Sequence, residues 1–256
     1  MTNVKLYVVF SVVLTLLGMV SFWYLQSYWL LLGVWLFRTV GNGVVGHRYF
    51  AHNQFTVGPV SRKLFAYYTT MSGYSTPIYW IVQHLHHHRN SDLSTDVHSP
   101  RNGIMNSMLL WSFRPSMITS VFSDRSSKIM LIKASKDVDV LRASRHFYLI
   151  NTIVYGVIFF ISVDLFFAWA ASYVIELIKY GTINAILHLH KFPGNYRNHS
   201  LSDDSQNNLL IGFISLGFGW HNNHHADPKK LDLQEKWWEY DIEAQIGKIF
   251  SKILRF

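Results

Sequence analysis

The sequence predicts an all-α integral membrane fold, with four transmembrane helices in two hairpins joined to a cytoplasmic helical cap. Half of the 256 residues are hydrophobic and only 15% are charged, whereas average soluble domains carry roughly 25% charged residues. The apolar residues gather in two pairs of long runs, and most of the 14 histidines lie beside them. We expect residues 1–256 to form a single domain, with residues 46–145 and 184–256 making the cap.

The first hairpin is predicted from two apolar runs near the start of the chain. Residues 6–23 hold no charge, and residues 29–45 are interrupted only by Arg38. Each run would be about 26–28 Å long as a helix, enough for a thin bilayer core. The turn between them carries aromatic residues, as membrane interfaces do, namely Trp23, Tyr24, Tyr28 and Trp29. A signal peptide is the alternative for the first run, but no small-residue cleavage site precedes the second run.

The second hairpin repeats this arrangement later in the chain. Residues 147–163 and 165–183 are apolar and meet at Asp164. The two tight turns hold no lysine or arginine, whereas residues 46–145 hold 12 basic and 5 acidic residues. The positive-inside rule therefore places the N-terminus and the cap in the cytoplasm. The net charge of +8 suits contact with anionic membrane lipids, and no nucleic-acid partner is expected.

One further stretch has the length of a membrane span. Residues 64–82 are largely apolar but contain Gly73 and Pro77. A fifth crossing here would put His52 and His84 on opposite faces of the membrane. If these histidines share a site, the stretch must be re-entrant or lie along the interface, because broken helices at membrane depth need protein around them.

Nine histidines form groups at the predicted cytoplasmic boundary. Two triads have the spacing i, i+3, i+4, which places each on one helix face: His84, His87 and His88, then His221, His224 and His225. His47 and His52 end the second span, and His188 follows the fourth. A single histidine is most often a satisfied polar group, and His-rich tracts also bind metal adventitiously, but the same triad occurs twice. In a chain without cysteine, nine imidazoles indicate a metal site, and they are too many for one ion.

Three histidine motifs resemble the histidine boxes of membrane fatty-acid desaturases, closest to the delta-9, stearoyl-type branch that acts on acyl-CoA. They read His47-Arg-Tyr-Phe-Ala-His52, Trp80-x-x-x-His84-x-x-His87-His88 and Gly219-Trp220-His221-Asn-Asn-His224-His225. Further matching segments are Asp96-x-His98-x-Pro100, Asn184-x-x-x-His188 and Trp237-Trp238-Glu239. The resemblance covers the chain from about Trp29 to Asp241.

The resemblance implies a diiron centre in the cap. One iron would be held by His47, His52, His84, His88 and His224. The other would be held by His87, His188, His221 and His225, with Asn184 reaching it through a water. No catalytic side chain is expected beyond these ligands.

Three further residues are candidates for supporting roles. Asp96 and His98 are candidates for orienting the ligands, because metal-bound imidazoles need hydrogen-bond partners. A helix cap is the alternative for Asp96. Trp80 would line the acyl tunnel, with an interfacial anchor as its alternative.

The implied function is a fatty-acyl desaturase that inserts a cis double bond at delta-9, using dioxygen and two electrons. The electrons would come from a separate carrier, a ferredoxin or a cytochrome b-type protein with its reductase. The lean chain favours a bacterial inner membrane over the endoplasmic reticulum. The alternatives are an acyl or sterol-type hydroxylase on the same diiron scaffold, and a non-catalytic membrane protein that binds or transports metal.

The sequence leaves three alternatives for the group that carries the acyl chain. The acyl-CoA enzymes of the family carry Arg-Asp-His-Arg where this chain reads Val82-Gln83-His84-Leu85. In those enzymes the charged pair helps to hold the CoA head group. Acyl-lipid, acyl-carrier protein and acyl-CoA are therefore all candidate substrates.

Overall fold

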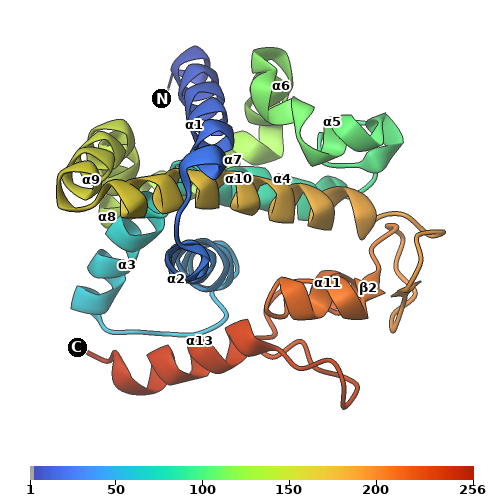
Figure 1. The fold of residues 1–256 in the computed structure, drawn as a ribbon. Helices are drawn as coiled ribbons and strands as arrows, with labels where there is room; N and C mark the ends of the chain where they lie inside the picture. The colour runs from blue at the N-terminus through green and yellow to red at the C-terminus, as the bar shows by residue number, and fades with distance from the viewer. Residues whose placement is uncertain (1–2) are drawn as a thin grey trace.

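The computed structural model describes residues 3–256 and is mostly helical (Figure 1). The α-helices are α1 (Val4–Tyr24), α2 (Tyr28–Thr39), α3 (Pro59–Met71), α4 (Pro77–Asn90), α5 (Ile104–Met108), α6 (Pro115–Ser123), α7 (Arg125–Ser135), α8 (Val138–Arg145), α9 (Phe147–Ile161), α10 (Val163–Ile186), α11 (Leu209–Ile214), α12 (His221–Ala226) and α13 (Ile242–Ile253). The remaining elements are the π-helix η1 (Val40–Ala51), the 3-10 helices η2 (Pro100–Asn102) and η3 (Leu110–Phe113), and the antiparallel pair β1 (Asn195–Tyr196) and β2 (Asn207–Asn208).

Two helices of the described chain have both the length and the apolar composition of a membrane span. They are α1 and the continuous helix formed by α2 and η1, Tyr28–Ala51. A third span results if α8 and α9, which meet at 61°, count as one bent element. The described chain thus has two or three candidate spans. Three of the four predicted apolar runs lie within helices, and the run 147–163 extends past the end of α9 to the first residue of α10. The predicted span 165–183 lies in α10, which is not among the candidate spans.

Helix α10 lies at the centre of the long helices. Both α1 and α2 pack against it, and Figure 1 shows α1 crossing it steeply. The approach of α1 requires a glycine, because a Cβ atom at Gly18 would lie 2.6 Å from the carbonyl oxygen of Ala170. Small residues of this kind let apolar helices approach closely, which favours van der Waals packing in the absence of water.

The single charge in the second apolar run is buried and paired with neutral oxygens. The guanidinium of Arg38 donates to the Ser172 hydroxyl at 2.7 Å and to the carbonyl oxygen of Trp169 at 3.0 Å. It also donates to the carbonyl oxygen of Ser72. These bonds tie α2 to α10 and to the end of α3, so Arg38 acts as a structural link between helices.

The stretch 64–82 is broken in the middle. Helix α3 ends at Met71 and α4 begins at Pro77. Between them, Gly73 adopts a φ of +72°, a left-handed conformation that glycine adopts without the cost of a Cβ clash. His52 and His84 lie together, with their Nε2 atoms 2.6 Å apart. A fifth crossing between these two histidines is therefore excluded.

The membrane topology can be tested by cysteine labelling, because the chain has no cysteine of its own. We predict that an impermeant maleimide labels Gln26→Cys in intact cells but not Lys128→Cys or Ser202→Cys. All three side chains are solvent-accessible in the protein itself, so permeabilised cells should label all three and serve as the control. Labelling of Lys128→Cys or Ser202→Cys in intact cells would contradict the predicted cytoplasmic cap.

Candidate metal centre

Five histidines point their ring nitrogens at one another. The Nε2 atom of His84 lies 2.6 Å from that of His52 and 3.0 Å from that of His88. The Nε2 atom of His224 lies 3.1 Å from that of His47 and 2.9 Å from that of His88. We call this set the five-histidine group. Its members come from η1, the residue after it, α4 and α12.

Four further histidines form a second group beside the first. The Nε2 atoms of His188 and His221 lie 3.0 Å apart. The Nε2 atoms of His87 and His225 are buried without a hydrogen-bond partner. One nitrogen from each of these four rings lies within 4.8 Å of the others. This four-histidine group draws on α4, α12 and the second residue after the end of α10.

The two triads divide between the groups in opposite ways. In α4, His84 and His88 join the five-histidine group and His87 joins the other. In α12, His224 joins the five-histidine group and His221 and His225 join the other. Both helices thus contribute to both groups. In each triad, the residues at i and i+4 belong to one group and the residue at i+3 belongs to the other.

The π-helix explains the spacing of the first two histidines. His47 and His52 are five residues apart, and in an α-helix such residues lie on different faces. The N–H group of His52 bonds to the carbonyl oxygen of His47 at 3.2 Å, the i→i+5 pattern of a π-helix. Both rings therefore reach the same group of nitrogens.

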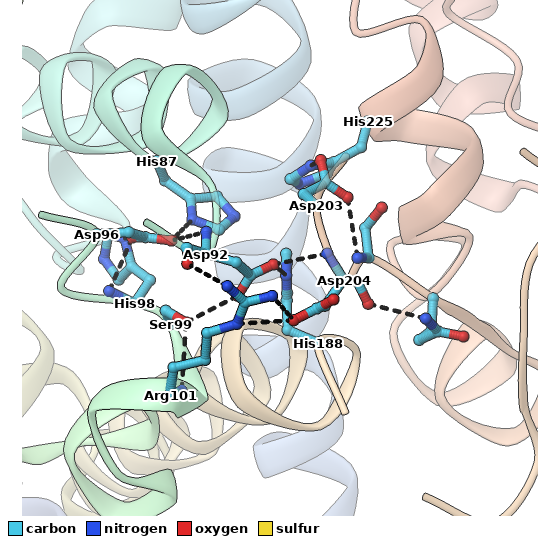
Figure 2. A network of polar contacts seen from close by, with 12 residues as sticks. His87, Asp92, Asp96, His98, Ser99, Arg101, His188, Asp203, Asp204 and His225 are labelled. Atoms are coloured by element: carbon cyan, nitrogen blue, oxygen red, sulfur yellow. Dashed lines mark hydrogen bonds and ion pairs between the residues drawn. The ribbon is translucent and has the colours of Figure 1, made fainter. Parts of the chain in front are cut away.

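Three aspartates bond to the opposite nitrogens of the four-histidine group (Figure 2). The Nδ1 atoms of His87, His188 and His225 lie 2.9, 2.7 and 2.9 Å from carboxylate oxygens. The partners are Asp96, Asp92 and Asp203 respectively. Only Asp96 was expected from the sequence, while Asp92 and Asp203 carried no signal beyond their acidic side chains. Such contacts fix the tautomer so that Nε2 keeps its lone pair.

His98 and Trp80 lie at the edge of the nine rings. The backbone N–H of His98 donates to Asp96 at 2.9 Å, while its ring lies edge-on to Trp111. The ring of Trp80 stacks on His84 with centroids 5.5 Å apart. It belongs to an aromatic wall on the side of the long helices, together with Tyr74, Tyr180 and Phe218.

Asn184 is half-buried on α10, one helical turn before His188. A separate polar cavity of about 370 Å³ is lined by residues that include His86, Asn106 and Arg114. None of the nine histidines lines this cavity, so it is distinct from both groups.

Burial keeps most of these imidazoles neutral. It lowers the pKa of His84, His88 and His224 well below the usual value, and that of His52 to about 3. Burial also lowers the pKa of His221 well below the usual value and that of His225 to about 4. Neutral imidazole is the form that binds metal.

In the aspartates, hydrogen bonds and neighbouring charges outweigh the effect of burial on the pKa. Burial by itself would raise the pKa of Asp92, but the hydrogen bonds from His188 and its other neighbours lower it to about 2. Burial would also raise the pKa of Asp96, and the charge and hydrogen bond of His87 lower it. Both groups are therefore carboxylates at neutral pH and accept the ring N–H bonds.

A buried ion triad that the sequence analysis missed supports the five-histidine group. Arg48 follows His47 and lies 2.9 Å from Asp241 and 3.1 Å from Glu243. All three side chains are fully buried. They join η1 to α13 and hold the helix that carries His47.

A second network supports α12. The side-chain amide of Asn223, within the third histidine motif, donates to Glu239 at 3.0 Å. Glu239 also accepts from Asn198 at 2.8 Å and from the Tyr196 hydroxyl at 2.7 Å. The late Trp237-Trp238-Glu239 segment thus has a structural role in positioning the second triad.

A mostly helical chain with long apolar helices and buried histidine groups has the make-up of a metal-binding membrane enzyme. Residues 6–241 match the family model described as fatty acid desaturase. The match covers most of the chain, and the protein belongs to that family. The predicted family and enzyme class, an oxidoreductase of fatty-acyl chains, are confirmed.

Several characterised proteins are similar to most of this chain. "Delta-9 acyl-lipid desaturase 2" of Arabidopsis thaliana is 28% identical over 85% of this chain and 70% of its own length. "Icosanoyl-CoA 5-desaturase" of Limnanthes douglasii is 24% identical over 83% of this chain and 60% of its own length. "Hex-5-enoyl-[acyl-carrier protein] acetylenase" of Moorena producens (strain JHB) is 26% identical, with shares of 83% and 70%.

The buried ion triad makes a stability prediction. Arg48→Met leaves Asp241 and Glu243 as buried carboxylates without their cation, so the free energy of unfolding should fall by about 3–5 kcal/mol. Denaturant unfolding of the detergent-solubilised protein measures this change. Arg62→Met is the control, because Arg62 pairs with Asp137 but is 42% exposed, and it should cost about 0–1 kcal/mol. Equal losses in the two variants would contradict the structural role of the triad.

Proposed function

We propose that the protein introduces a cis double bond at delta-9 of a saturated fatty-acyl chain, using dioxygen, two electrons and two iron ions. The observation that carries this proposal is the convergence of nine imidazoles, seven from buried residues, in a group of five and a group of four. Family membership supports the chemistry, and the two groups support two ions per chain.

The residues fit the proposed irons. His47, His52, His84, His88 and His224 would hold one ion. His87, His188, His221 and His225 would hold the other, with Asn184 near it on α10. Several ring nitrogens, such as Nε2 of His87 and His225, are buried without a protein hydrogen bond. Since such orphaned atoms cost free energy, a bound cation accounts for them, and imidazole suits iron as well as zinc and copper.

The overall reaction needs an oxidant that amino-acid side chains lack. A CH2–CH2 unit and O2, with two electrons and two protons, give a CH=CH unit and two water molecules. Bound iron would supply the capacity to activate dioxygen for removing hydrogen from an unactivated methylene. We assign no catalytic role to any side chain other than the nine histidines.

The protein's own contribution is to position the groups and exclude water. Seven of the nine histidines are buried, and His88 and His225 are partly buried. They lie in α4, α12, η1 and the segments next to them. Asp96 and His98 would hold the ligand shell in place from outside. The aromatic wall of Trp80, Tyr180 and Phe218 gives an acyl chain an apolar surface next to His84 and His47. On this basis we assign Trp80 to the acyl tunnel.

We propose an acyl-lipid or acyl-carrier protein as the substrate form. Arg101, a candidate for binding head-group phosphates, is occupied by Asp204 at 2.6 Å. Val82, where acyl-CoA enzymes of the family carry an arginine, is fully buried among apolar residues. Neither position therefore offers a free cation to a CoA head group, whose phosphates normally recruit fixed cations.

The membrane setting follows from the same arrangement. We propose four spans with the metal centre on the cytoplasmic side, in a bacterial inner membrane. There a ferredoxin or a cytochrome b-type carrier with its reductase would deliver the two electrons. The apolar faces of α1 and α9, with exposed residues such as Val9, Leu16 and Phe160, suit a lipid environment.

Expression in a host that makes no unsaturated fatty acids tests this function. The protein should restore unsaturated acyl chains, and mass spectrometry should locate the double bond between carbons 9 and 10. His224→Ala should abolish the product, because it removes a ring from the five-histidine group. His199→Ala should not, because His199 pairs with Glu235 outside both groups. A hydroxylated acyl chain in place of the alkene would refute desaturation.

The substrate form can be tested with purified enzyme and a reducing system. We predict that acyl-lipid or acyl-carrier protein substrates are desaturated at least as fast as stearoyl-CoA. Each labelled substrate is supplied separately, with hydrolysis and acyl exchange blocked. Turnover of acyl-CoA alone would show that other cations replace the missing pair and that the assignment is wrong.

A further inference from the structure

The two histidine groups differ in what supports them. Three of the four rings in the four-histidine group donate to carboxylates, at 2.7–2.9 Å (Figure 2). Among residues 3–256, no ring of the five-histidine group has a carboxylate within ion-pair distance. The Nδ1 atoms of His47 and His224 are buried without any hydrogen-bond partner. The four-histidine group, which has fewer rings, is therefore the one whose rings are held by carboxylates.

Two of the three carboxylates that support the four-histidine group, Asp92 and Asp96, belong to one hydrogen-bonded network. The N–H of Asp92 donates to Asp96 Oδ2 at 3.1 Å, so the supports of His188 and His87 are linked. Asp92 accepts from the Ser99 hydroxyl at 2.8 Å and from the N–H of Asp204 at 2.8 Å. Its own backbone has a φ of +60°, a conformation that aspartate tolerates better than most residues. The carboxylates of Asp92 and Asp96 are thus each held by several hydrogen bonds.

An ion pair closes this network on the outside. Arg101 donates from Nε and Nη2 to Asp204 Oδ2, at 2.9 and 2.6 Å, and from Nη1 to the carbonyl oxygen of Asp92 at 3.0 Å. Asp203, the partner of His225, is the residue before Asp204. The loop after α4 and the loop before β2 are therefore clamped together around three rings of one group (Figure 2).

This arrangement has a direct consequence for metal binding. A carboxylate on Nδ1–H fixes the tautomer of the ring and makes Nε2 a stronger donor, and losing one such partner typically lowers metal affinity about 10–100-fold. Three carboxylates also place negative charge beside one ion and not the other. The five-histidine group has one more imidazole, and this must be weighed against the effect of all three carboxylates on metal affinity.

We propose that the four-histidine group is the high-affinity site, and that Asp92, Asp96 and Asp203 make it so. The centre then fills first at the four-histidine group and loses metal first from the five-histidine group. This inference rests on the proposed function, since it takes the two groups as the two metal sites. The three aspartates are positioning residues that act through His188, His87 and His225.

The order of metal loss tests the inference on the full-length protein. The purified protein is loaded anaerobically with Fe²⁺ and equilibrated with increasing chelator, and retained iron is measured by mass spectrometry. Two ions should leave in separate steps, at chelator concentrations at least about tenfold apart. His47→Ala should remove the weak step and His221→Ala the strong one. The opposite assignment, or one common step in the wild type, would overturn the inference.

Conservative variants then test the cause. Asp92→Asn and Asp203→Asn should each weaken the strong step about 10–100-fold and leave the weak step where it is. The matched control is Glu235→Gln, which breaks the same kind of contact, 2.8 Å from His199, outside the centre. Equal weakening of both steps, or of neither, would overturn the role of the aspartates. If an aspartate variant does not fold, the wild-type order and the histidine variants still decide the inference.

Failure of this inference is distinguishable from failure of the proposed function. Fully loaded wild-type protein that desaturates its substrate, but releases both ions in one step, contradicts only the unequal affinities. Wild-type protein that never binds more than one ion, and gives no alkene, contradicts the diiron desaturase itself.

Discussion

The structure depends on bringing nine imidazoles together in a buried place. Ring nitrogens taken out of water cost free energy unless something satisfies them, and several here have no protein partner. Opposing elements must therefore hold the rings in position from outside. Arg48 with its two carboxylates ties η1 to α13, Glu239 anchors α12, and Asp92 links the loop after α4 to the loop before β2.

The long helices provide the platform for this cap. Helix α10 receives α1 through a glycine contact and α2 through the bonds of Arg38. Its end leads directly to His188. The aromatic wall on the side of these helices reaches the five-histidine group through His84 and His47. An apolar chain lying among the helices would thus meet the ligands at their apolar side, while the aspartates support them from the polar side.

Much of the fold and of the site could be predicted from the sequence. Helices cover the apolar runs 6–23, 29–45, 147–163 and 165–183 almost completely. An apolar run in a membrane can satisfy its backbone N–H and C=O groups within the segment only as a helix. The ends shifted by a few residues, and the second run continues into a π-helix as far as Ala51. The repeated i, i+3, i+4 spacing identified six of the nine histidines that converge, because helical periodicity puts each triad on one face; His47, His52 and His188 were identified by their places beside the apolar runs. Four spans and a cytoplasmic cap stay predictions, as do the iron ions.

The histidines that converge could be identified from the sequence, because helix period and hydropathy are local properties that depend only on the order of residues. The partners that support these histidines became visible in the folded chain alone. Asp92 and the pair of Arg101 with Asp204 join loops more than 100 residues apart, and nothing local distinguishes these acids, or Asp203, from others in the chain. The same holds for Arg48, whose partners lie more than 190 residues away. Hydrogen bonds between distant segments depend on how the helices pack, so the unequal support of the two histidine groups became visible only in three dimensions.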